Sequence, residues 1–138
     1  MTRGELLEFL RRHKLAVVAT VTADGAPEAA LVGVAFTDAL EIVFDTALAS
    51  RKAKNLRANS RVAVVVGGWE REITAQLEGV AEFPSGEERA RLHAAYVAVW
   101  PDGEARAASA SIGYVRVRIA WARYSDFETG RIEELELA

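Results

Sequence analysis

Short apolar runs separated by turn residues recur along the chain and predict a mainly β fold. In the run 73–83, apolar and small residues largely alternate with polar ones, as in a strand with one buried face. The run 15–22 leads into Asp24-Gly25, a dipeptide favoured in two-residue hairpin turns. The expected strands are 15–22, 28–36, 40–46, 61–67, 73–83 and 114–124, with an edge strand near 132–137.

Three further segments have the spacing of amphipathic helices. Residues 3–12 place their large apolar side chains on one face. A second helix is expected after Ser50, whose side chain can accept a hydrogen bond from the free N–H groups at the helix start. A third is expected over 87–99, and Ser85 with Glu88 three residues later has the spacing of a capping box.

The short connections make most of the six or seven strands antiparallel neighbours. The run RVAVVVG at 61–67 is apolar on both faces, which suits the middle of a sheet or barrel. Closing such a sheet into a β-barrel removes its exposed edges, so we expect a barrel with peripheral helices. With 138 residues and no flexible linker, residues 1–138 are expected to form a single domain.

Composition narrows the classes of protein that fit. No apolar run approaches the roughly 20 residues of a membrane helix, and the N-terminus lacks the apolar core and cleavage site of a signal peptide. The absence of cysteine excludes disulfides and thiolate chemistry. A net charge of −3 argues against nucleic acid as a partner. We therefore expect a cytoplasmic protein that binds neither membranes nor nucleic acid.

One segment departs from this acidic background. Residues 45–61 contain no acid after Asp45 but five bases: Arg51, Lys52, Lys54, Arg57 and Arg61. Free N–H groups at a helix start attract anions, and Arg51 and Lys52 would add two full charges at the same end. The pattern indicates a phosphate site just after the strand 40–46. The alternative is a solvated basic helix face.

The expected strand 28–36 is unusual for its small residues, Ala29, Ala30, Gly33 and Ala35. One explanation is the taper of a small barrel, whose interior alternates small and large side chains. Another is close approach of a flat ligand, because glycine inside a strand often marks such a place.

Side chains that carry out chemistry are scarce. His13 and His93 are the only histidines, and neither has a second metal ligand at suitable spacing. No Ser-His-Asp arrangement, glycine-rich Walker loop or pair of carboxylates can be identified, so no catalytic or metal-binding residue is predicted. Such a protein either binds a ligand or uses the chemistry of a cofactor.

The order of strands, the Asp-Gly hairpin and the motif Thr46-x-x-x-Ser50-Arg51-Lys52-x-x-Asn55-Leu56 resemble the pyridoxamine 5′-phosphate oxidase-like family of flavin-binding split barrels. This resemblance implies a homodimer with two FMN molecules at the subunit interface. It also implies that Arg51 and Lys52 hold the FMN phosphate, with backbone or hydroxyl contacts from Asp45, Thr46 and Ser50.

The same resemblance assigns the rest of the cofactor site. The second strand would line the isoalloxazine face through Ala30, Val32, Gly33 and Val34, and Gln76, or less well Thr74, would reach the flavin from the fifth strand. The implied activity is FMN-dependent redox chemistry on an unknown small substrate. Trp100 and Trp121 are either stacking partners for a flavin or substrate, or ordinary packing residues.

Departures from the family pattern leave alternatives open. Pyridoxamine phosphate oxidases carry arginine and lysine where this chain has Ala30 and Ala35, and their C-terminal Arg-x-His motif is missing. Both differences argue against vitamin B6 oxidation. Two other functions fit the sequence: a reductase using the deazaflavin F420, with Lys54, Arg57 and Arg61 following its anionic tail, and a flavin or haem carrier without turnover.

Overall fold

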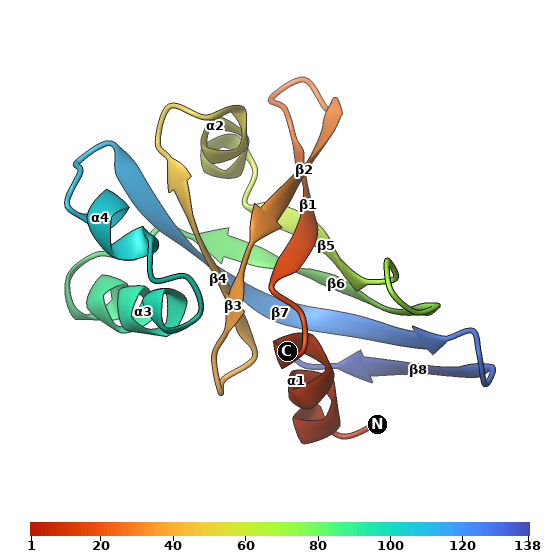
Figure 1. Cartoon of the computed structure of the whole chain (residues 1–138). Coiled ribbons are helices and arrows are strands. Elements are labelled where there is room, and N and C mark those ends of the chain that lie inside the picture. Colours follow the sequence, from red (N-terminus) through yellow and green to blue (C-terminus); the bar gives the residue numbers. More distant parts are fainter.

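One antiparallel sheet of eight strands forms the centre of the protein in a computed structural model that describes all 138 residues (Figure 1). The strands follow the order β2-β1-β5-β6-β7-β4-β3, and β8 pairs with β7 outside this path. Their bounds are β1 Leu15–Val21, β2 Pro27–Gly33, β3 Ala35–Phe36, β4 Glu41–Ala47, β5 Arg61–Gly67, β6 Ile73–Glu82, β7 Ile112–Asp126 and β8 Arg131–Glu136.

The two edge strands of this path, β2 and β3, are consecutive in the chain and separated only by Val34. The sheet therefore curls until both of its edges meet at one segment, and the predicted barrel is confirmed. The prediction of one unbroken strand over 28–36 is wrong, because β2 pairs with β1 whereas β3 pairs with β4. The Val34 N–H donates to the carbonyl of Lys14 (2.9 Å) at this crossing point.

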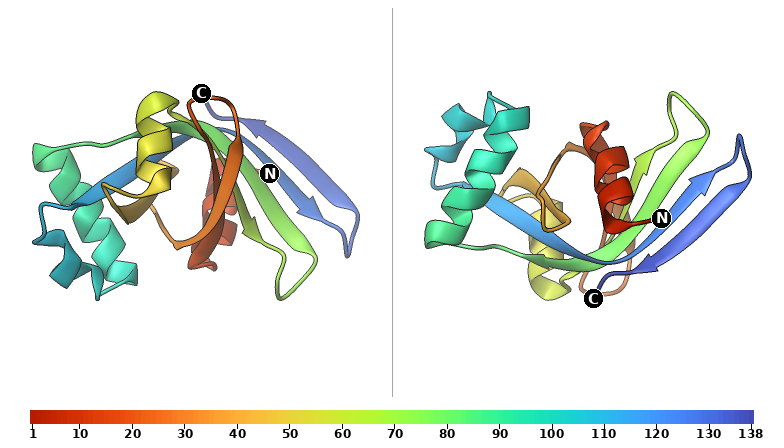
Figure 2. Two further views of the ribbon diagram at one scale, coloured as in Figure 1. Left: turned by 90° about the horizontal axis from the view of Figure 1, so that it is seen from above. Right: turned by 90° about the horizontal axis from the view of Figure 1, so that it is seen from below.

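Four helices, one more than expected, surround the barrel: α1 Arg3–Arg11, α2 Arg51–Ala58, α3 Gly86–Val99 and α4 Gly103–Ala107. The helices α1 and α2 lie at opposite ends of the barrel, and α3 and α4 lie to one side of it (Figures 1 and 2). None of them combines the length and the apolar character needed to cross a membrane.

The helix caps differ in part from expectation. Ser50 caps α2 as predicted, with its hydroxyl accepting from the Ala53 N–H at 3.1 Å. The predicted capping box at α3 is wrong: Ser85 makes no side-chain cap bond, and Glu88 instead pairs with Arg91 and Arg116.

A β-bulge changes the faces of β7. Glu78 of β6 pairs with Trp121, but the next residue, Gly79, pairs with Ile119, so Ala120 has no partner in β6. An unpaired residue reverses the alternation of the side chains that follow it. The sequence pattern places Trp121 on the same face as Ile119, but in the structure Ala122 enters the core and Trp121 is only partly buried.

Candidate anion-binding site

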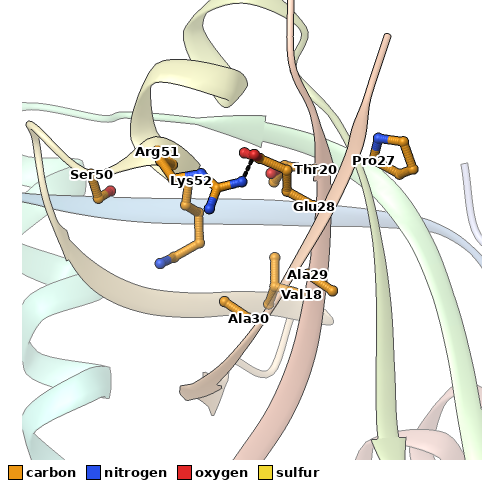
Figure 3. A pocket seen from close by; sticks show the side chains of 9 residues that line it. All are labelled: Val18, Thr20, Pro27, Glu28, Ala29, Ala30, Ser50, Arg51 and Lys52. Carbon is orange, nitrogen blue, oxygen red and sulfur yellow. Dashed lines mark ion pairs between the residues drawn. The ribbon is translucent and has the colours of Figure 1, made fainter.

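A cavity of about 280 Å³ lies between the middle of β1, the start of β2 and the first turn of α2 (Figure 3). It brings together the strand rich in small residues and the basic helix start, which stand out in the sequence as two separate features. Its lining residues are Val18 and Thr20 from β1, Pro27, Glu28, Ala29 and Ala30 from β2, and Ser50, Arg51 and Lys52 at the start of α2.

The start of α2 presents free hydrogen-bond donors to this cavity. The Ser50 hydroxyl caps the Ala53 N–H and lies 3.0 Å from the Thr46 hydroxyl, which fixes the turn between β4 and the helix. The Lys54 N–H donates to the Ser50 carbonyl, but no protein group accepts from the backbone N–H groups of Arg51 and Lys52. Two unsatisfied N–H groups at a helix start form an environment that favours an anion.

Lys52 is the cation that the cavity surrounds most closely. In Figure 3 its side chain points away from the ion pair of Arg51 and Glu28; it is partly buried and forms no ion pair of its own. Burial lowers the pKa of Lys52, because removing water disfavours the charged ammonium group. A bound anion would offset this desolvation, so Lys52 is a ready partner for a negatively charged ligand.

Arg51, by contrast, already has an anionic partner. Its guanidinium forms an ion pair with Glu28 on β2, drawn as the dashed line in Figure 3. The other carboxylate oxygen of Glu28 accepts from the side-chain amide of Asn55 at 2.8 Å, and the same amide donates to the Thr20 hydroxyl at 2.9 Å. Asn55 is only 7% exposed, so its hydrogen bonds to Glu28 and Thr20 are shielded from solvent. The sequence reading missed Glu28, Asn55 and Thr20 as members of the site.

The residues of β2 do not all face the cavity. Glu28, Ala30 and Val32 alternate with exposed neighbours and share one face of the strand, but only the first two line the cavity. Gly33 lies against the Trp100 ring, and Val34 is fully buried with its carbonyl accepting the Trp100 indole N–H at 3.0 Å. The structure therefore explains Gly33 by packing, and it does not bring Val34 to the cavity.

Asp45 is directed away from the cavity, toward α3 and α4. Its carboxylate accepts from the Tyr96 hydroxyl at 3.2 Å and from the Arg106 guanidinium at 2.7 Å. Burial, together with the charge of Asp45, raises the pKa of Tyr96 to about 12. Thr46, the next residue, is connected to the cavity through its contact with Ser50. Of the two, only Thr46 is thus placed beside the predicted phosphate site.

Gln76 lies on the opposite face of the sheet. Val18 and Thr20 of β1 line the cavity, whereas the alternate residues Val17 and Ala19 line a groove with Gln76 on the outer face. Within one chain the structure does not bring Gln76 together with the basic helix start. Thr74 of the same strand is absent from the cavity lining as well.

Neither histidine lines the cavity. One ring nitrogen of His93 lies 2.9 Å from the Tyr114 hydroxyl, and the other lies 3.0 Å from the Glu104 carboxylate. The Nδ1 atom of His13 lies 3.0 Å from the Phe9 carbonyl at the end of α1. Both rings are thus engaged in structural contacts.

The barrel closed at Val34 and the cavity at the start of α2 together define a split barrel with a cationic corner. A family profile described as pyridoxamine 5′-phosphate oxidase matches residues 2–126, and the chain belongs to this family. A comparison with curated proteins found no match.

Solved structures with the same fold bear different names. A haem-binding protein from Mycobacterium smegmatis superposes with a TM-score of 0.87 at 19% identity over 99% of this chain, which spans 59% of that protein. The conserved hypothetical protein Rv2991 from Mycobacterium tuberculosis superposes with a TM-score of 0.75 at 27% identity, over 91% of this chain and 85% of that one. The haem storage protein HutZ from Vibrio cholerae superposes with a TM-score of 0.74 at 17% identity, over 85% of this chain and 89% of that one.

Proposed function

We propose that this protein is an FMN-dependent oxidoreductase that acts on a small substrate as a homodimer. The observation that carries the proposal is the cavity at the start of α2, where Lys52 has no anionic partner and two backbone N–H groups have no acceptor. Membership of the pyridoxamine 5′-phosphate oxidase family supports a flavin as the ligand.

The donor set of the cavity fits a phosphoryl group. Lys52 and Arg51 supply charged donors, the start of α2 supplies backbone N–H groups, and the small side chain of Ala30 lines the same cavity. Charge-assisted hydrogen bonds of this kind are worth about 1.5–3 kcal/mol each. This chain would hold the phosphate end of the cofactor by these contacts.

The volume of the cavity, about 280 Å³, is slightly smaller than the roughly 300–1,000 Å³ of ordinary ligand sites. One chain therefore encloses the phosphate end of FMN better than the whole molecule. A second subunit would supply the remaining walls, in agreement with the proposed homodimer.

The outer face of the sheet offers a surface for that second subunit. Leu31, Val17 and Val65 pair side by side across β2, β1 and β5, and Ala29, Ala19 and Ala63 form a parallel row beside them. Leu31 is 61% exposed and Val65 38% exposed. We call these six residues the outer apolar face. A continuous apolar sheet face of this kind is typical of a surface that is covered in the assembled protein.

When bound, FMN would supply the transfer of a hydride or of electrons between a nicotinamide cofactor and the substrate. The residues of this chain would bind, orient and shield the flavin, because no histidine, cysteine or free carboxylate pair lies in the cavity. No side chain is assigned as an essential acid or base.

The test begins with the visible spectrum of the purified protein and a titration of the apoprotein with FMN, with F420 in a parallel arm. Micromolar or tighter FMN binding and NADH turnover above that of free FMN are expected. Absence of a flavin band together with absence of binding at micromolar FMN would reject the proposal, and a clear preference for F420 would replace the cofactor.

Haem is a second candidate ligand, because the names of two structures with this fold refer to haem. The cavity at α2 lacks a histidine, and both ring nitrogens of His93 are engaged elsewhere. We therefore rank haem below FMN. A haem titration followed at the Soret band, with His13→Ala and His93→Ala as variants, separates the two ligands.

A further inference from the structure

The Glu28 carboxylate lies within the same cavity as the two cations proposed to hold a phosphate. A carboxylate beside an anion site is unfavourable for a second negative charge. Its position needs an explanation, because Glu28 is held there from two sides, by the Arg51 guanidinium and by the Asn55 amide.

We propose that Glu28 is an internal counter-anion that occupies Arg51 while the cavity is empty and competes with the anionic group of the ligand for it. This inference rests on the proposed function of the cavity as a phosphate site. It makes Glu28 a determinant of ligand affinity, because an incoming phosphate must draw Arg51 away from Glu28.

The burial of the partners indicates which group moves. The Glu28 side chain is 21% exposed and is bonded to Asn55, which is itself buried. The Arg51 side chain is 79% exposed and, apart from Glu28, has no protein partner. Arg51 can therefore turn toward a ligand while Glu28 stays in place.

The charges around Glu28 show why the competition affects small anions. Arg51 and Lys52 are the charged groups that line the cavity with it, and Asn55 and Thr20 are neutral donors or acceptors. Glu28 reduces the formal charge of the cavity lining from +2 to +1, because one acid stands against two bases. Free phosphate has no other contacts to offset this loss, whereas a nucleotide-like ligand gains contacts through its ring. Glu28 thereby keeps inorganic phosphate out of an empty site.

The test compares inorganic phosphate and FMN binding by the wild type, Glu28→Gln and Glu28→Ala, measured by calorimetry for phosphate and by flavin fluorescence for FMN. The glutamine variant keeps an oxygen that can accept the hydrogen bond from Asn55. The alanine variant tests whether any gain comes from new hydrogen bonds that the glutamine amide donates to the ligand. Both variants should bind phosphate and FMN about fivefold more tightly, the upper range for an ion pair with a solvent-exposed partner. Glu87→Gln, at an exposed position on α3 outside the cavity, makes the same change in net charge and should leave both affinities unchanged.

Arg51→Ala completes a double-mutant cycle. If Glu28 acts through Arg51, replacing Glu28 in the Arg51→Ala background should give a much smaller gain. A full gain in that background, or equal or weaker phosphate binding by the Glu28 variants, overturns the inference, and so does a failure of every variant to bind phosphate. Tighter phosphate binding without any FMN binding would reject the flavin function and retain the role of Glu28.

Discussion

The indole of Trp100 packs so tightly on Gly33 that a Cβ at Gly33 would lie 2.8 Å from two atoms of the ring. The indole N–H also donates to the carbonyl of Val34 at 3.0 Å, and the Lys14 ammonium lies 5.8 Å from the ring centroid. These contacts fix the end of α3 against the point where β2 becomes β3. Trp100 is therefore a packing residue, whatever else it contacts.

Gly33→Ala should destabilise the protein by about 1–3 kcal/mol, because the added methyl group must displace a ring that is held on two sides. Urea unfolding followed by tryptophan fluorescence measures the change. Gly4→Ala in α1 is the matched control, since its Cβ would meet only the Thr2 hydroxyl at 3.9 Å and alanine favours a helix. Equal stability of Gly33→Ala and wild type would contradict this view of the contact.

Lys52→Ala should weaken FMN binding by about 1.5–3 kcal/mol, the value of one charge-assisted hydrogen bond. Fluorescence quenching of FMN on titration with apoprotein gives the dissociation constant. Lys54→Ala removes the same charge from the same helix at an exposed position outside the cavity and should have little effect. Equal losses in the two variants would mean that α2 attracts FMN only by its overall charge.

Leu31→Lys should convert the proposed dimer to monomers, because it places a charge at a residue of the outer apolar face that is 61% exposed. Sedimentation velocity at several protein concentrations measures the molecular mass. Ile132→Lys introduces the same charge on β8, at a residue that is 51% exposed and outside that face, and should leave the mass unchanged. A wild type that sediments as a monomer would reject the dimer directly.

The free energy of unfolding should fall between about pH 10 and pH 12, because Tyr96 ionises at a lower pH in the unfolded chain than in the folded protein. Its pKa in the folded state is raised to about 12, first by burial and then by Asp45, whereas an unfolded tyrosine titrates near pH 10. The unfolded chain therefore loses its proton first, so the stabilisation is complete below about pH 10 and declines as the pH rises through the folded pKa. Asp45→Asn should lower the pKa of Tyr96, measured by tyrosinate absorbance. An unchanged alkaline titration would show that Asp45 does not act on Tyr96.

Local signals in the sequence account for much of the barrel. The Asp24-Gly25 turn, with Gly25 at a φ of 92°, forms the hairpin between β1 and β2, and the Ser50 cap starts α2. The alternation over 73–83 places Ala75 and Leu77 in the core, as predicted. Each of these features depends on a few adjacent residues, so one sequence suffices to recognise it.

Features that depend on distant partners could not be predicted. The break at Val34 follows from β2 and β3 pairing with different strands, and the bulge at Ala120 is visible only in the register between β6 and β7. The same limit applies to the site: the basic helix start was recognisable, but its contact with Glu28 joins residues on separate elements. The direction of Asp45 is set by Arg106, far along the chain.

The one-residue junction at Val34 also restricts how the chain length can vary. An insertion or deletion there would shift β3 by one position against β4 and exchange the faces of Ala35 and Phe36, which differ in size and are both buried. The turn at Asp24-Gly25 and the β7–β8 turn carry no such restriction, because each lies at an exposed hairpin tip. Natural length variation and engineered fusions should therefore be tolerated at these tips and excluded at the junction.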